Sequence, residues 1–262
     1  MGQINFFKYH GAGNDFIFID EFNMHLHLKT DTIRWLCDRH FGIGADGLIR
    51  ILPSAKADFE MRYYNADGHL GSMCANGGRC AALFAVHQEI VSKKADFIAS
   101  DGHHKANVTD AGNTGEVLLQ MNDVETIEYH NDHYFVDTGS PHYISFRENI
   151  KHLDLNAEAR PIRWNYREKG TNVNFVEARN GKYAIRTFER GVEAETLACG
   201  TGITAAAIAL AEKNNWQKAT VQLLAAGGKL EVSLEKKGGI YTNIWLKGPA
   251  EKVFEGTTQI RT

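Results

Sequence analysis

Residues 73–80 of this chain read MCANGGRC and run into the apolar stretch AALFAV, and this segment decides how the chain folds. A second version of it, LACGTG at residues 197–202, occurs about half a chain later and runs into ITAAAIALA. In each version a cysteine comes directly before small residues that permit a tight turn. A helix that is apolar on nearly every face is surrounded by protein. We therefore expect Cys74 and Cys199 each to lie at the start of a buried helix.

The two segments belong to a longer duplication. Gly13 lies 61 positions before Cys74, and Gly139 lies 60 positions before Cys199. Both halves also carry a stretch that alternates apolar and polar residues, as a half-buried strand does, at residues 59–68 and 183–191. Paired landmarks at a nearly constant offset indicate two related domains.

The duplication predicts an α/β fold, close to α+β, in which two domains face each other across a pseudo-twofold axis. We expect each domain to be a strongly curved sheet or barrel wrapped around its central helix. The predicted domains are residues 1–125 and 126–251, and a strand within 252–262 completes the first domain or packs with the second. The predicted strands are 4–8, 16–19, 48–52, 59–64, 117–121, 173–176, 183–187, 221–224, 230–234, 240–247 and 253–260.

One further helix is predicted over residues 32–39, with Thr30 or Asp31 as its N-cap. The composition, 43% hydrophobic and 23% charged with a net charge of −3, is that of a globular protein and argues against a nucleic-acid partner. No apolar stretch is long enough to span a membrane, and the N-terminus lacks the pattern of a signal peptide. Four cysteines in 262 residues do not make a disulfide scaffold, so we expect a cytoplasmic protein with reduced thiols.

The predicted position of the two thiols suggests proton transfer at carbon. A free cysteine has a pKa of about 8.5, and the partial positive charge of a helix N-terminus lowers it. The amides near Asn76 and near Gly200 could hold a carboxylate, because a helix N-terminus binds anions. One thiolate and one thiol flanking the adjacent carbon could remove its proton from one face and return a proton to the other. This scheme requires no cofactor.

Other interpretations of the cysteines are weaker. A buried cysteine is commonly a small apolar residue, which we predict for Cys37 and Cys80. The chain contains no C-x-x-C and no H-x-x-x-H, which argues against a zinc site. A cysteine protease needs one nucleophile and leaves the second thiol without a role.

The motifs resemble those of the diaminopimelate epimerases nearly from end to end. The matching segments are residues 10–16, 38–47, 62–68, 73–80, 139–142, 171–175 and 188–202. The resemblance implies interconversion of LL- and meso-2,6-diaminopimelate in lysine and peptidoglycan synthesis, without pyridoxal phosphate or metal. It also implies a homodimer. The alternatives are another cofactor-independent amino acid racemase and a non-catalytic amino acid-binding relative.

The resemblance also assigns roles to residues. It implies that Cys74 and Cys199 are the acid/base pair and that His142 and Glu189 tune them. The implied contacts to the carboxylate at the reacting end are Ala75, Asn76, Gly200 and Thr201. The implied contacts to the rest of the substrate are Asn14, Asn65, Asn172, Glu189 and Arg190. An arginine suits the distal carboxylate, because its guanidinium donates two parallel hydrogen bonds.

Two positions depart from the family pattern. Ala75 stands where a glycine is expected, and we predict a negative φ there, because alanine is strained at positive φ. Ser140 stands where many members carry asparagine, which leaves a direct substrate contact open.

Overall fold

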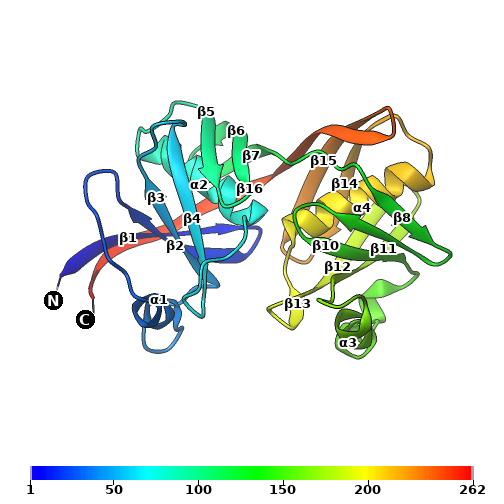
Figure 1. Ribbon diagram of the computed structural model, residues 1–262, viewed down its shortest axis with the longest axis horizontal. Helices are drawn as coiled ribbons and strands as arrows, with labels where there is room; N and C mark the ends of the chain where they lie inside the picture. Colours follow the sequence, from blue (N-terminus) through cyan, green and yellow to red (C-terminus); the bar gives the residue numbers. More distant parts are fainter. Residues whose placement is uncertain (1, 261–262) are drawn as a thin grey trace. The chain divides into compact units, whose positions relative to one another are not determined.

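A computed structural model describes residues 2–260 of the chain. The chain forms two compact units, one from Met1–Leu119 with Pro249–Thr262 and the other from Gln120–Gly248 (Figure 1). The predicted division between residues 125 and 126 stays a prediction. The helices are α1 (Thr30–Cys37), α2 (Ala75–His87), α3 (Leu155–Asn165) and α4 (Gly200–Lys213), with a short 3₁₀ helix at Ile150–His152.

The first unit is a closed barrel around α2. Its strands pair in the order β1 to β7, β7 pairs with β16, and β16 pairs with β1, which closes the ring. Helix α2 contacts β1, β2, β3, β4, β5 and β6, so it lies inside the barrel. The strands are β1 (Gln3–Gly11), β2 (Asn14–Asp20), β3 (Gly47–Leu52), β4 (Phe59–Asn65), β5 (Lys94–Ala99), β6 (Gly102–Ala111), β7 (Thr114–Gln120) and β16 (Ile240–Gln259).

The second unit wraps a sheet around α4. Its strands follow the order β8-β9-β10-β11-β12-β14-β15-β16, and β13 pairs with β12 at the side. Helix α4 contacts β9, β10, β11, β14 and β15. The strands are β8 (Ile127–His130), β9 (His133–Asp137), β10 (Pro141–Phe146), β11 (Asn172–Arg179), β12 (Lys182–Glu189), β13 (Ala194–Thr196), β14 (Lys218–Ala225) and β15 (Gly228–Lys237).

The pairing order confirms the duplication. In the first unit β1/β2 is antiparallel, β2/β3 parallel, β3/β4 antiparallel, β4/β5 parallel and β5/β6 antiparallel. In the second unit β9/β10, β10/β11, β11/β12, β12/β14 and β14/β15 follow the same sequence. Each parallel pair needs a crossover, and these are α1 and α2 in the first unit and α3 and α4 in the second. The expectation of strands wrapped around one central helix, twice over, is therefore confirmed for each unit.

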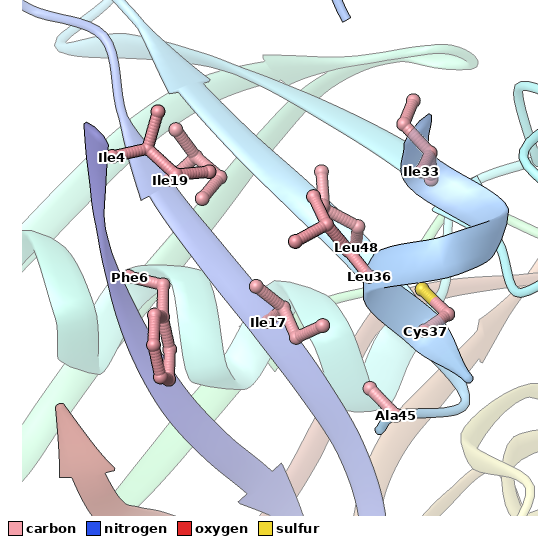
Figure 2. Packing of buried hydrophobic residues seen from close by; sticks show 9 residues of the cluster. All are labelled: Ile4, Phe6, Ile17, Ile19, Ile33, Leu36, Cys37, Ala45 and Leu48. Carbon is pink, nitrogen blue, oxygen red and sulfur yellow. The ribbon is translucent and has the colours of Figure 1, made fainter. Parts of the chain in front are cut away.

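The helix α1 covers the outside of the first barrel. Figure 2 shows Leu36 and Cys37 of α1 beside Ile17 of β2 and Leu48 of β3, and all four are buried. Burial of such side chains contributes about 1.5–3 kcal/mol each relative to exposure. This packing holds α1 beside the β2/β3 pair, whose N-terminal ends carry part of the candidate site.

The predicted bounds and caps of α1 were wrong. The helix begins at Thr30 with Lys29 as N-cap, and no side chain caps it. The carboxylate of Asp31 instead bonds to Arg34 at 2.7 Å. The helix ends at Cys37, two residues early, because the side chain of Asp38 accepts hydrogen bonds from the amides of His40 and Phe41 and forms a turn.

Each predicted strand lies within a strand of the structure, except that Met121 and Ile260 fall one residue beyond the ends of β7 and β16. Several elements were not predicted. Helix α3 contains Pro161, a residue that argues against a helix from sequence. The predicted strand at 253–260 is the continuation of β16 through Gly248 and Pro249, and its pairing with β1 places it in the first unit. Residues 261 and 262 lie outside the described residues. The unpredicted elements are α3, β5, β6, β8, β9 and β13.

Candidate active site

Cys74 is the N-cap residue of α2. Its backbone is extended, with φ −108° and ψ 117°, and its carbonyl accepts the first helical hydrogen bond from Gly78 at 2.8 Å. An α-helix leaves the amides of its first turn without intrahelical partners, so the partly buried thiol lies beside donors that favour negative charge. Ala75 is the first residue of α2 and is not among the described non-glycine residues with positive φ, so the prediction of negative φ is confirmed.

Cys199 occupies the same position in the second unit. It is the N-cap of α4, with φ −114° and ψ 109°, and its carbonyl accepts from Ile203 at 2.8 Å. Its side chain is buried. The prediction that both thiols lie at the start of a buried helix is confirmed, and the two N-caps have nearly the same backbone conformation.

A directed chain of polar side chains holds Asn14 against Cys74. Arg79 donates to Oδ1 of Asn76 at 2.8 Å, and Nδ2 of Asn76 donates to Oδ1 of Asn14 at 3.2 Å. Nδ2 of Asn14 donates to the carboxylate of Asp46 at 2.8 Å. A guanidinium only donates hydrogen bonds and a carboxylate only accepts them. The side-chain amides of Asn76 and Asn14 therefore cannot exchange the positions of their nitrogen and oxygen atoms. Oδ1 of Asn14 therefore faces the sulfur of Cys74, at 3.6 Å.

An ion-pair network fixes Asp46, the carboxylate at the end of this series of hydrogen bonds. Asp15 pairs with Lys8 and with Arg39, each at 2.7 Å, and Arg39 also pairs with Asp46 at 2.7 Å. Burial raises the pKa of Asp15, but the hydrogen bonds from Arg39 and Lys8 outweigh it and hold that pKa well below the usual range. Lys8 also donates to the carbonyl of Gly44. The carboxylate that orients Asn14 is thus fixed in place.

Arg79 is a buried cation at the start of α2. Its side chain is fully buried, and it also donates to the carbonyls of Ala75 at 3.3 Å and Pro249 at 3.4 Å. Burial lowers its pKa, while the nearby thiols Cys80 and Cys74 act to raise it. A buried positive charge here favours an anion at this helix start.

The second unit has its own polar chain, which ends at Cys199. The sulfur lies 3.4 Å from the hydroxyl of Thr201, and that hydroxyl lies 2.9 Å from Nε2 of His142. Nδ1 of His142 lies 3.0 Å from Nδ2 of Asn174, and Oδ1 of Asn174 accepts from Thr187 at 2.9 Å. Asn174 and Thr187 were missed from sequence. The alternation of the strand could have found Asn174, since it shares a face of β11 with the predicted Asn172.

Asn172 holds the turn that carries Arg190. Its Nδ2 donates to the carbonyl of Pro141 at 3.0 Å, and its Oδ1 accepts from the amide of Arg190 at 2.8 Å. Glu189, the last residue of β12, accepts a hydrogen bond from the hydroxyl of Thr196. The structure thus brings Asn172, Glu189 and Arg190 together at the end of β12.

A second anchor of this turn was not predicted. Buried Arg163 of α3 donates to Glu193 at 2.7 Å, and Oε1 of Glu193 also accepts from the amide of Gly191 at 2.9 Å. The turn after β12 is therefore tied to α3, and with it the position of Arg190.

Asn65 is the last residue of β4 and pairs with Gly47 of β3. It is exposed at the end of β4, and its backbone forms the turn to His69. Its role and that of Ser140 stay predictions. Among residues 2–260 no cluster of three or more histidine, cysteine, aspartate or glutamate side chains is arranged to hold a metal ion. In the same part of the chain, no helix combines the length and apolar character needed to cross a lipid bilayer.

The burial of His142 predicts a pH-dependent stability. Burial and the positive charge of Arg190 lower the pKa of His142 to about 3, against an opposing hydrogen bond from Asn174. An unfolded histidine has a pKa of about 6.5. Between these values the unfolded chain binds a proton that the folded chain does not, so stability falls as the pH drops below 6.5. At pH 5.0 the expected loss from this residue is about 2 kcal/mol relative to pH 7.5.

Urea unfolding of the unmodified chain and of His142→Gln, each at pH 7.5 and pH 5.0, measures this contribution. We expect the change in unfolding free energy between the two pH values to be about 2 kcal/mol smaller in the variant. Other titrating groups are common to both proteins and cancel. Equal pH dependence in the two proteins would show that His142 does not stay neutral when the chain is folded.

Solved structures with this fold include a PhzF-family protein and an amino acid epimerase. A phenazine biosynthesis protein of the PhzF family from Bacillus anthracis superimposes with a TM-score of 0.76 at 14% identity, covering 99% of this chain and 100% of that one. A hydroxyproline epimerase from Agrobacterium vitis, solved with trans-4-hydroxy-L-proline, gives a TM-score of 0.68 at 12% identity, covering 98% and 92%. The fold is therefore the one that the PhzF and amino acid epimerase structures share.

Sequence comparison identifies one family among the proteins with this fold. The family model for diaminopimelate epimerase matches residues 6–127 and 134–253. The diaminopimelate epimerase of Flavobacterium psychrophilum is 46% identical over 257 residues, which cover 96% of this chain and 98% of that protein. This chain belongs to the diaminopimelate epimerase family, as its motifs indicated.

Proposed function

We propose that this chain interconverts LL-2,6-diaminopimelate and meso-2,6-diaminopimelate by proton transfer at the α-carbon, with Cys74 and Cys199 as the two acid/base groups. The observation that carries the proposal is the repeated placement of a thiol at the N-cap of the central helix of each unit. The proposal requires both helix starts to meet the same substrate molecule.

The chemistry needs one sulfur in each protonation state. A thiolate takes the α-proton, so an S–H bond forms, the C–H bond breaks, and its electron pair stays on the carbon and the adjacent carboxylate. The thiol on the opposite face then gives its proton to that carbon, which inverts it and leaves this sulfur as the thiolate. The two sulfurs exchange roles, and the reverse reaction or exchange with water restores them.

The N-termini of α2 and α4 can bind the carboxylate beside the reacting carbon. We assign its contacts to Ala75, Asn76, Gly200 and Thr201, because amides at a helix N-terminus bind anions and lower the energy of the negative charge that develops there. The buried charge of Arg79 adds to this field in the first unit.

The far end of the substrate carries a second amino acid group. We assign its carboxylate to Arg190, whose backbone Asn172 holds in place, and its ammonium to Glu189. Asn14 and Asn65 supply further polar contacts. Since the acid/base pair requires free thiols, we place the protein in the cytoplasm. The homodimer stays a prediction.

The test is incubation of the purified chain with LL-diaminopimelate in D₂O, without added cofactor. We expect the meso isomer to form and to carry deuterium at the inverted carbon, read by chiral chromatography and mass spectrometry. Lysine is the matched control, because it has both amino groups but lacks the distal carboxylate, and its exchange should be slower by at least about 10²-fold. Deuterium in proline but not in diaminopimelate would instead assign the chain to another racemase.

A further inference from the structure

The polar chain that ends at Cys199 has a fixed direction. Nδ2 of Asn174 donates to the carbonyl of Tyr143 at 3.1 Å, and a carbonyl only accepts. Oδ1 of the same amide accepts from Thr187. The nitrogen and oxygen of this amide therefore cannot exchange positions, and its NH₂ group faces Nδ1 of His142 at 3.0 Å.

The orientation of this amide decides which ring nitrogen of His142 carries the proton. Nδ1 faces a donor and must accept, so the proton of a neutral imidazole lies on Nε2. The ring is fully buried, which keeps it neutral. Nε2 then donates to the hydroxyl oxygen of Thr201 at 2.9 Å. The hydroxyl hydrogen of Thr201 is left to point at the sulfur of Cys199, 3.4 Å away.

We propose that Asn174 is a positioning residue that holds His142 in the Nε2–H form, so that Thr201 donates a hydrogen bond to Cys199 and stabilises its thiolate. The inference rests on the proposed function only in taking Cys199 as one of the acid/base groups. His142 then moves no proton during the reaction, because Nδ1 is occupied by a donor and Nε2 is a donor itself.

Two charged side chains, Arg190 and Glu189, lie at the end of β12 beside these hydrogen-bonded residues. Arg190 at the end of β12 contributes positive charge toward His142, and Glu189 beside it accepts from Thr196. The start of α4 adds its own partial positive charge. Against this background, a hydrogen bond to a charged sulfur is expected to lower the pKa of the thiol by about one unit, which is a tenfold change in the thiolate fraction near neutral pH.

The first test measures the Cys199 thiol in a Cys74→Ala background, by the pH dependence of its alkylation with iodoacetamide. Burial raises the pKa of Cys37 to about 12 and that of Cys80 further, so neither competes. We expect Thr201→Val to raise the pKa of Cys199 by about one unit, and Thr201→Ser to restore it.

Thr204→Val is the matched control on the same helix. The hydroxyl of Thr204 is buried and donates to the carbonyl of Gly200 at 2.9 Å, one turn back. It should leave the pKa of Cys199 unchanged. If Thr201→Val shifts the pKa no more than Thr204→Val does, the proposal is overturned.

The second test reads the tautomer directly in the full chain. In protein labelled with ¹⁵N-histidine, the two ring nitrogens have different chemical shifts, and the His142→Gln variant identifies the signals of His142. We expect the Nε2–H form from pH 6 to pH 8, and we expect Asn174→Leu to populate the Nδ1–H form and to raise the pKa of Cys199. An Nδ1–H ring in the unmodified chain would overturn the proposal, whether or not the leucine variant folds.

Neither test uses a substrate. Absence of epimerisation in the D₂O assay would therefore refute the proposed function and leave the hydrogen-bond chain standing. If the pKa of Cys199 is unchanged in Thr201→Val, the proposed hydrogen bond from Thr201 is refuted and the proposed function still stands.

Discussion

Replacing Cys199 with alanine is expected to lower the rate of epimerisation by roughly 10³-fold or more, within the range that general acid–base groups contribute. The variant keeps only one of the two proposed acid/base thiols, that of Cys74, and so loses proton transfer on one face of the carbon. Substrate binding should change little, because alanine at an N-cap leaves the helix amides in place. Initial rates from chiral chromatography and affinities from calorimetry separate the two effects. Cys74→Ala should behave in the same way.

The control is Cys80→Ala, which lies in the helix that Cys74 caps, six residues after Cys74, and is fully buried. Its turnover should stay close to that of the unmodified chain. Proton exchange distinguishes a mechanism with two bases from one with a single base. With two bases, each single variant can exchange the α-proton of one isomer with solvent but cannot invert the α-carbon. Normal epimerisation in both Cys74→Ala and Cys199→Ala would show that the thiols are not the bases.

The position of the thiols was predictable because the signal is local and occurs twice. Small residues before an all-apolar run predict a turn and a buried helix. The same pattern is weak when it occurs once, and its repetition in the second half of the chain makes the prediction firm. Strands with an apolar run, such as β2, or with apolar and polar residues in alternation, such as β12, were predictable because their signal is also local. The start of α1 was not, because Asp31 had a competing partner in Arg34.

The contacts that support the thiols were not predictable, because the residues that make them are distant from each other in sequence. Asn174 and Thr187 are opposite each other in the β11/β12 register, and Asp46 reaches Asn14 through the β2/β3 pairing. Arg79 follows two glycines and looks like a surface charge, yet the barrel closes around it. Local composition carries no signal for such contacts, since they exist only once the strands have paired.

Gly202→Ala is expected to lower turnover by about 10²-fold or more, because the third residue after Cys199 lies against the polar chain. A Cβ at Gly202 would lie 2.5 Å from Oδ1 of Asn174 and 3.2 Å from Cε1 of His142. Both side chains are buried and hydrogen-bonded, so they have no room to withdraw. We expect the added methyl to displace the pair and to cost about 1–3 kcal/mol of unfolding free energy.

The duplication supplies the matched control, since Gly77 is the third residue after Cys74. A Cβ there would lie 2.8 Å from Cδ1 of Ile49, the end of a side chain that can rotate away. Alanine is the better helix former by about 1 kcal/mol, so Gly77→Ala should be neutral or slightly stabilising. Urea unfolding and turnover measured on both variants compare the same substitution at the same helix position. Equal effects would mean that Gly202 serves the helix alone, whereas a loss confined to Gly202→Ala would show that activity depends on the His142–Asn174 contact.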